Sequence, residues 1–209
     1  MKRSAALLLA CAAMSIAASA AARDTGDESP RNDRDRDRLG PLVPDFARLA
    51  TGGWLGAANL ALGYAVFDDV LNASVGYGFT PEREAGHRVH NLDVTLTVRP
   101  FELGIGDFRF VPVYVGGGGM YVVGNEYEVQ YPYRYRRIVA HYYYPTALHW
   151  FALLGGEVGL HVDDPFFDRH AFFYQVVGLD TFITSYFDND ATLDVTDVLS
   201  SQIGYRASW

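Results

Sequence analysis

Seven ionisable side chains lie in stretches of this chain that are otherwise rich in glycine, aliphatic and aromatic residues. They are Asp93, Arg99, His149, Glu157, His161, Asp180 and Arg206. Acids and histidines in such surroundings can pass protons or ions along a path, and acids with arginines can form buried ion pairs. A charge taken out of water without a partner costs roughly several kcal/mol. We therefore favour a salt-bridged cluster over a proton or ion path.

A second group of residues could support nucleophilic catalysis. A hydroxyl nucleophile needs a histidine base and an acid within hydrogen-bond reach. Residues of these kinds are Ser185, His90, His141, His149, Asp188 and Glu126. No spacing brings a serine, a histidine and an acid together, and His90 is in phase with an apolar face. We predict that the protein is not an enzyme and has no catalytic residue.

The sequence predicts no metal site and no cofactor. His141 and His149 are separated mainly by apolar residues, and His87 and His90 lie at the end of an expected loop. The run Gly116 to Gly119 is not followed by a turn into a helix, which a phosphate-binding loop requires. It lies in a strand pattern, where glycine permits a bend or a close approach of neighbouring backbones.

Tyrosine and arginine alternate in one segment and suggest a binding surface. Its members are Tyr127, Tyr131, Tyr133, Arg134, Tyr135, Arg136 and Arg137. Tyrosine offers a large contact area at low entropy cost, and arginine can bind phosphate or carboxylate. Such a surface suits lipopolysaccharide head groups, glycans or another protein. The alternative is that these rings only brace one another in a tyrosine-rich loop.

The elements that carry these residues are strands. Apolar residues alternate with polar or small ones in four clear runs, at residues 71–79, 91–99, 148–161 and 199–209. This period of two is typical of strands with one apolar face. Runs at 54–66, 108–122 and 171–184 are also predicted strands, the last two apolar on both faces. An eighth is expected at 45–51, joined to the next by a tight hairpin at Gly52-Gly53.

The first 43 residues have a different character. Met1 to Ala22 has a positive start, an apolar run and small-residue cleavage sites, which predicts a cleaved signal peptide. Residues 23–43 are mostly charged or polar, and we expect a disordered periplasmic leader. Cleavage removes the only cysteine, Cys11, together with Lys2 and Arg3. The remaining 15 basic and 25 acidic residues argue against binding to nucleic acid.

The end of the chain carries a resemblance. Trp209, Ala207, Tyr205 and Ile203 lie on one face of the last strand, and Arg206, Gly204 and Gln202 lie on the other. This ending resembles the C-terminal strand of small Gram-negative outer-membrane β-barrels of the OmpA, OmpX and OmpW kinds. The resemblance implies that Tyr205 and Trp209 are an assembly signal read by the barrel-assembly machinery. The His-x-Ser-Asn pattern of lipid A deacylases does not occur.

The expected fold is therefore all-β, a transmembrane antiparallel up-and-down barrel of about eight strands over residues 44–209, in the outer membrane. An interior of that size is filled by side chains. We predict a monomeric structural or surface-interaction barrel in contact with outer-membrane lipid, including lipopolysaccharide. The alternatives are a narrow, porin-like channel or small-ligand transporter of the OmpW kind and, after it, an enzyme that modifies lipid A or phospholipid.

Overall fold

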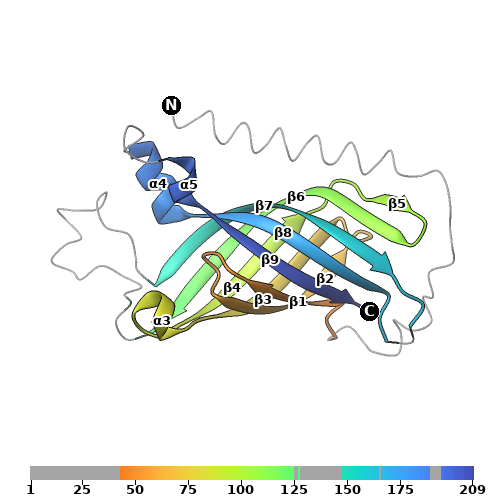
Figure 1. The fold of residues 1–209 in the computed structure, drawn as a ribbon, viewed down its shortest axis with the longest axis horizontal. Coiled ribbons are helices and arrows are strands. Elements are labelled where there is room, and N and C mark those ends of the chain that lie inside the picture. The colour runs from red at the N-terminus through yellow and green to blue at the C-terminus, as the bar shows by residue number, and fades with distance from the viewer. Residues whose placement is uncertain (1–42, 125–126, 128–146, 165, 189–193) are drawn as a thin grey trace. The chain divides into compact units, whose positions relative to one another are not determined.

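Nine strands form one antiparallel sheet in the computed structural model, and eight of them close into a barrel (Figure 1). The structure describes residues 43–124, 127, 147–164, 166–188 and 194–209. The strands are β1 (Phe46–Thr51), β2 (Ala58–Val66), β3 (Leu71–Thr80), β4 (Val89–Val98), β5 (Leu103–Ile105), β6 (Phe108–Val123), β7 (Leu148–His161), β8 (Arg169–Leu179) and β9 (Leu199–Ser208). Three short helices are α3 (Glu82–Ala85), α4 (Asp180–Asp188) and α5 (Val195–Val198).

The first and last strands close the barrel. β1 pairs with β9 from Phe46 opposite Ser208 to Thr51 opposite Ile203. β4 pairs directly with β6, so β5 lies outside the ring and pairs with β6 alone. The predicted antiparallel barrel of eight strands is confirmed, including its weakly patterned first strand. The predicted signal peptide and nearly all of the predicted leader lie outside the described residues.

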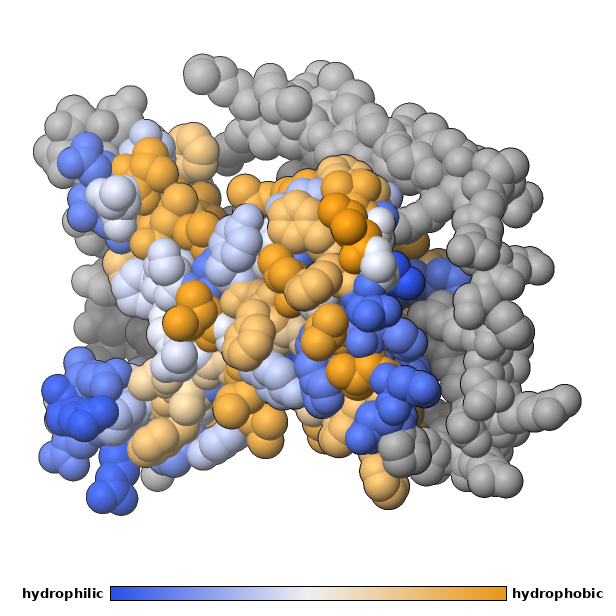
Figure 2. Space-filling view, turned by 45° about the vertical axis from the view of Figure 1, so that its right-hand side comes forward, coloured by the Kyte–Doolittle hydropathy of each residue, from blue (hydrophilic) through white to orange (hydrophobic). Residues whose placement is uncertain are grey.

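The outer wall of the barrel is largely apolar, whereas much of its interior is polar. On β4, Asn91, Asp93, Thr95 and Thr97 are all buried. The residues between them face outward, and Leu92, Val94 and Leu96 are each about half exposed, at 48–54%. Figure 2 shows hydrophobic side chains over much of one face of the barrel, with the strongest blue toward the margins. None of the helices in the described ranges is long and apolar enough to cross a membrane.

A bulge shifts the inward-facing phase of β6, whose inward residues Val111, Tyr114, Met120 and Val122 are themselves apolar. Its register against β7 shifts between Val111 and Tyr114, so one extra residue enters the strand there. The bulge changes which positions face inward, and both Val111 and Tyr114 are buried. Pro112 lies within the bulge, a position that tolerates the missing backbone N–H.

The expected strand 171–184 is too long, because β8 ends at Leu179 and α4 begins at Asp180. The Asp180 carboxylate accepts hydrogen bonds from the backbone N–H of Trp150, at 3.2 Å, and of Thr181, at 2.7 Å. Its side chain thus occupies the place of a strand carbonyl beside β7. Asp180 is therefore a helix-starting residue and not a lone charge within a strand.

The first hairpin also differs from the expectation. Six residues, Gly52 to Ala57, connect β1 to β2, so the Gly52-Gly53 tight turn is wrong. Both glycines do have positive φ, at +84° and +81°. The wider loop carries Trp54 away from the outer wall, and its ring stacks on Phe182 of α4 at 4.2 Å. Leu55 from the same loop is only 3% exposed.

Candidate functional site

The barrel interior has three layers, and the first is an ionic cluster where β1 starts and β9 ends. We call it the ionic end; its members are Asp69, Arg99, Glu102, Glu157, Arg169 and Arg206. Asp69 is its hub, because its carboxylate contacts the guanidinium groups of three arginines: Arg99, Arg169 and Arg206. The bond from Arg206 Nη2 to Asp69 Oδ1 is 2.8 Å. Three cations and three acids thus meet in one place.

Glu157 is the second acid of this cluster, on β7. It contacts Arg99 closely and lies 3.8 Å from Arg206 and 3.9 Å from Arg169. Arg169 also donates to Glu102 at 2.9 Å. Since Arg99, Glu157 and Arg206 are each 4% exposed, their mutual neutralisation is what makes their burial tolerable.

A turn with left-handed backbone conformation places Asp69 at the ionic end of the barrel. Phe67, Asp68 and Asp69 all have positive φ, between +54° and +66°. This conformation is uncommon for residues other than glycine, although aspartate tolerates it better than most. Asn72 Nδ2 donates to the Asp69 carbonyl at 3.0 Å and fixes the turn. Burial alone would raise the pKa of the Asp69 carboxyl, but Arg206, Arg99 and Arg169 together hold it well below its usual range.

The structure brings three of the predicted interior residues together here, Arg99, Glu157 and Arg206. It does not bring His161 to them: His161 is exposed, because it is the last residue of β7 and lies at the rim. Its prediction as an interior residue is wrong. Sequence reasoning missed Asp69 and Arg169, which lie just outside the strands that it predicted. The signal was the unusual pair Asp68-Asp69 in a turn that must bend back toward the arginines.

The middle layer is a hydrogen-bonded network around one arginine. Arg48 Nη2 and Tyr114 Oη both donate to Gln175 Oε1, at 2.9 and 3.0 Å. Gln175 Nε2 donates to Gln202 Oε1. Arg48 also lies over the ring of Phe173, 4.0 Å from its centroid. A Cβ at Gly204 would collide with that ring, so a glycine on β9 makes this packing possible.

Asp93 belongs to the same layer and is 2% exposed. It accepts from Asn59 Nδ2 at 2.8 Å and from Thr95 Oγ1 at 3.2 Å. Among the described residues it forms no salt bridge. Two small cavities lie in the interior, one beside Asp93 and one beside Glu157, and each has room for about one water.

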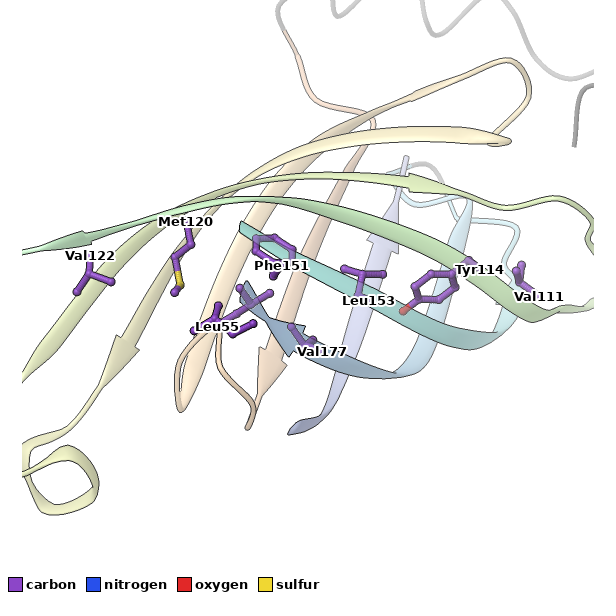
Figure 3. Packing of buried hydrophobic residues seen from close by; sticks show 9 residues of the cluster. Leu55, Val111, Tyr114, Met120, Val122, Phe151, Leu153 and Val177 are labelled. Atoms are coloured by element: carbon purple, nitrogen blue, oxygen red, sulfur yellow. The ribbon is translucent and has the colours of Figure 1, made fainter. Parts of the chain in front are cut away.

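The third layer is apolar and closes the other mouth of the barrel. We call it the apolar end; its members are Leu55, Met120, Val122, Phe151 and Leu179. Figure 3 shows Leu55 among Met120, Phe151 and Val177, inside the strands. The Leu55 carbonyl accepts from two inward amides, Asn59 at 3.3 Å and Asn91 at 3.2 Å. Polar side chains thus hold the loop that carries Leu55 in the mouth.

The remaining predicted residues lie around the apolar end. His149 Nδ1 lies 2.9 Å from Asp180 Oδ1, so these two are partners. His90 Nδ1 instead faces Tyr77 Oη at 2.5 Å on the outer wall, and Ser185 and Asp188 lie on α4. His141 and Glu126 are outside the described residues. A hydroxyl, a histidine and an acid at this mouth are therefore not shown to form a catalytic set.

Only Tyr127 of the tyrosine–arginine segment is described. Its Oη lies 2.6 Å from His87 Nε2. The other members, Tyr131, Tyr133, Arg134, Tyr135, Arg136 and Arg137, fall outside the described residues. Within the described ranges, no group of three or more His, Cys, Asp or Glu side chains could hold a metal ion.

Two tyrosine–histidine pairs lie on the outer wall, one near each rim. Tyr77 and His90 join β3 to β4 near the apolar end. At the ionic end, Tyr205 Oη and His170 Nδ1 are hydrogen-bonded and their rings stack at 5.8 Å. Phe167 extends this second group, since it contacts both His170, at 5.2 Å, and Trp209, at 6.3 Å. The predicted assembly signal thus lies in an aromatic cluster.

Neither a protein-family model nor a curated protein sequence matches this chain.

Proposed function

We propose that this protein is an integral outer-membrane β-barrel of a Gram-negative bacterium, of the structural or surface-interaction type. One observation carries the proposal: a closed barrel turns its aliphatic residues outward and its amides and charges inward. In water, this arrangement would expose a continuous apolar wall. In lipid, the ring of strands pairs its own backbone groups, and the wall presents mainly apolar side chains to the acyl chains.

The aromatic groups at the two rims support the same proposal. Amphipathic rings prefer the level of lipid head groups, where a ring can lie in the apolar region and its polar atom in water. Tyr77–His90 at one rim and Tyr205–His170 at the other supply rings with polar atoms at both levels. The aliphatic side chains of the wall lie between them. We take the rims as the two membrane interfaces, with Trp209 at the periplasmic one.

Depth-dependent fluorescence quenching tests membrane insertion. Trp150 is half exposed on the outer wall, whereas Trp54 is stacked on Phe182 in the mouth. Single-tryptophan variants would be reconstituted in bilayers whose lipids carry bromine on the acyl chains. We expect strong quenching of Trp150 and weak quenching of Trp54. Equally weak quenching of both would contradict a lipid-facing wall.

We propose further that the interior does not conduct. Two cavities, one in the middle layer and one beside the ionic end, each have room for about one water, and apolar side chains pack together at the other mouth. An OmpW-like transport barrel is the alternative, and planar-bilayer recording separates the two. We expect no single-channel steps from the purified protein. Reproducible steps that vanish when the protein is omitted would favour the channel.

The surface role is proposed from the sequence of residues 127–137. Its arginines suit phosphate groups, and lipopolysaccharide supplies these on the outer leaflet. A variant with Arg134, Arg136 and Arg137 changed to glutamine should bind lipopolysaccharide micelles at least several-fold more weakly. Arg83→Gln, at an exposed position on α3, is the control.

Lipid A from cells with and without the protein should give the same mass spectrum, since we propose no enzymatic activity.

Assembly by the outer-membrane barrel machinery is part of the same proposal. Tyr205 and Trp209 would be read on the last strand before it pairs with β1 and β8. Removal of Trp209 should lower the amount of folded protein in the membrane, whereas Phe166→Ala, a change in an exposed aromatic outside the last strand, should not. Equal membrane levels for both variants would argue against this signal.

A further inference from the structure

The cavity beside Asp93 points to a ligand that no side chain supplies. Its lining includes Asp93 of β4, Gln202 of β9, Ser74 of β3 and Arg48 of β1. Around the ring, β4 and β9 are four strands apart and therefore face each other across the interior. The cavity thus lies between two opposite walls of the barrel.

The orientation of the Gln202 amide follows from its neighbours. Gln175 Oε1 already accepts from Arg48 and Tyr114, so this oxygen must face those two donors. Gln175 Nε2 then faces Gln202 and must donate to it. Gln202 is left with its oxygen toward Gln175 and its Nε2 turned away. An amide flip of Gln202 would set two N–H groups against each other.

Gln202 Nε2 is consequently a donor without a partner. The side chain is 2% exposed, and this nitrogen has no hydrogen-bond acceptor within the described part of the chain. Across the cavity, the Asp93 carboxylate accepts two hydrogen bonds and has capacity for about two more. A buried donor and a buried acceptor thus border the same small void.

We propose that one water molecule occupies this cavity, accepts a hydrogen bond from Gln202 Nε2 and donates one to the Asp93 carboxylate. The free space equals that of about one water. A metal cation would face the N–H groups of Gln202 and Arg48, and an anion would face Asp93. Water alone can accept from one side and donate to the other.

The bound water completes a strut across the barrel. Asn59 of β2 holds Asp93, the water joins Asp93 to Gln202, and Gln175 of β8 joins Gln202 to Tyr114 of β6. Side chains from five strands of the wall, β2, β4, β6, β8 and β9, are then connected. The site goes beyond the proposed membrane role, since it is a property of the folded interior in either lipid or detergent.

Nuclear magnetic resonance of the full chain in detergent micelles tests the site. The side-chain amide protons of Gln202 should show a nuclear Overhauser peak to a long-lived water. The buried amide of Asn91 donates to Leu55 O and Met120 Sδ and does not line this cavity, so it serves as the control without a water peak. Asp93→Val should abolish or strongly weaken the Gln202 peak. Absence of the peak in the parent, or its persistence unchanged in Asp93→Val, would overturn the proposal.

A double-mutant cycle gives an independent readout. Gln202→Met should raise the unfolding equilibrium constant about tenfold in the parent, and at least threefold less than that in Asp93→Asn, because the charged acceptor is already gone. Thr97→Val, beside the other cavity, should have the same effect in both backgrounds. If the effects of Gln202→Met and Asp93→Asn were additive, the proposed water bridge would be overturned.

Replacing sodium by choline in the magnetic resonance experiment should leave the Gln202 peak unchanged. A shift of this peak would identify a cation instead of a water.

Discussion

The two ends of the barrel are closed by opposite chemistry. The ionic end joins three arginines to Asp69, Glu157 and Glu102, so it depends on charge balance among groups that are mostly buried. The apolar end is filled by Leu55 from a loop, packed against Met120, Val122 and Phe151 of β6 and β7. Loss of one charged partner should destabilise the whole ionic end, because the remaining buried charges are then unpaired. At the apolar end, the loss of stability should grow with the side-chain volume that is removed.

The most severe test of this difference is Asp69→Asn. It removes the hub charge and leaves three guanidinium groups to share two acids, one of them partly exposed. Breaking a buried ion pair from one side costs about 3–5 kcal/mol. We expect a loss of about 4 kcal/mol in the free energy of unfolding, measured by denaturant titration in micelles. Asp107→Asn, an exposed acid at the same end, should change it by less than about 0.5 kcal/mol.

The corresponding test of the apolar end is Leu55→Ala. Leu55 is 3% exposed, and truncation of a buried leucine costs about 2–5 kcal/mol, depending on how far the cavity collapses. We expect a loss of about 3 kcal/mol in the same titration. Leu60→Ala removes the same atoms from the outer wall, where Leu60 is 54% exposed, and should cost much less. Equal losses at both positions would contradict the plug.

A fall in pH should destabilise the ionic end and not the apolar end, with a smaller effect than either substitution. The pKa of Asp69 is lowered in the folded state, so its stabilisation is complete above the unfolded value of about 4 and is lost as the pH falls toward the native value. One such group contributes at most about 1.4 kcal/mol per pH unit. Stability should therefore fall below about pH 4, with a smaller slope in Asp69→Asn. Leu55→Ala should keep the parental slope, and a loss of slope there would couple the ends.

The smallest effect is expected where α4 meets the loop. Phe182→Ala removes the ring stacked on Trp54, a contact worth about 1 kcal/mol. Hydrogen exchange should quicken in α4 and in residues 52–57, while β8 stays protected. Phe187→Ala is the matched control on the same helix, since Phe187 is 76% exposed. Unchanged exchange in Phe182→Ala would mean that the stack does not hold the loop.

Much of the wall could be read from the sequence, because period-two alternation reports directly which side of a strand is polar. β3, β4, β7 and β9 were predicted within a few residues, and Trp209 led to a last strand paired with β1. The alternation did not predict the irregular parts of two strands. The bulge between Val111 and Tyr114 hid the phase of β6, and Asp180 ended β8 five residues early.

The interior was only partly predictable. Alternation indicated that Arg99, Glu157 and Arg206 share the inward face, and these three do meet. It gave no information on Asp69, whose place depends on a left-handed turn. It also placed His161 on the inward face, although this last residue of β7 lies at the rim and is exposed. Asn59, Asn91 and Leu55 meet only because a loop folds into the mouth. Contacts made by turns and loops require coordinates, since no periodicity governs them.

By itself, the sequence determined an antiparallel barrel with an apolar outer wall and a polar interior, because side-chain alternation is a local property of every strand. Only the tertiary structure decided how the interior is closed. Ring closure sets which strands face one another, and so brings Asp69 to three arginines and Gln202 to the cavity beside Asp93. These partners lie far apart in the chain, and their pairing depends on register and turns that alternation cannot encode.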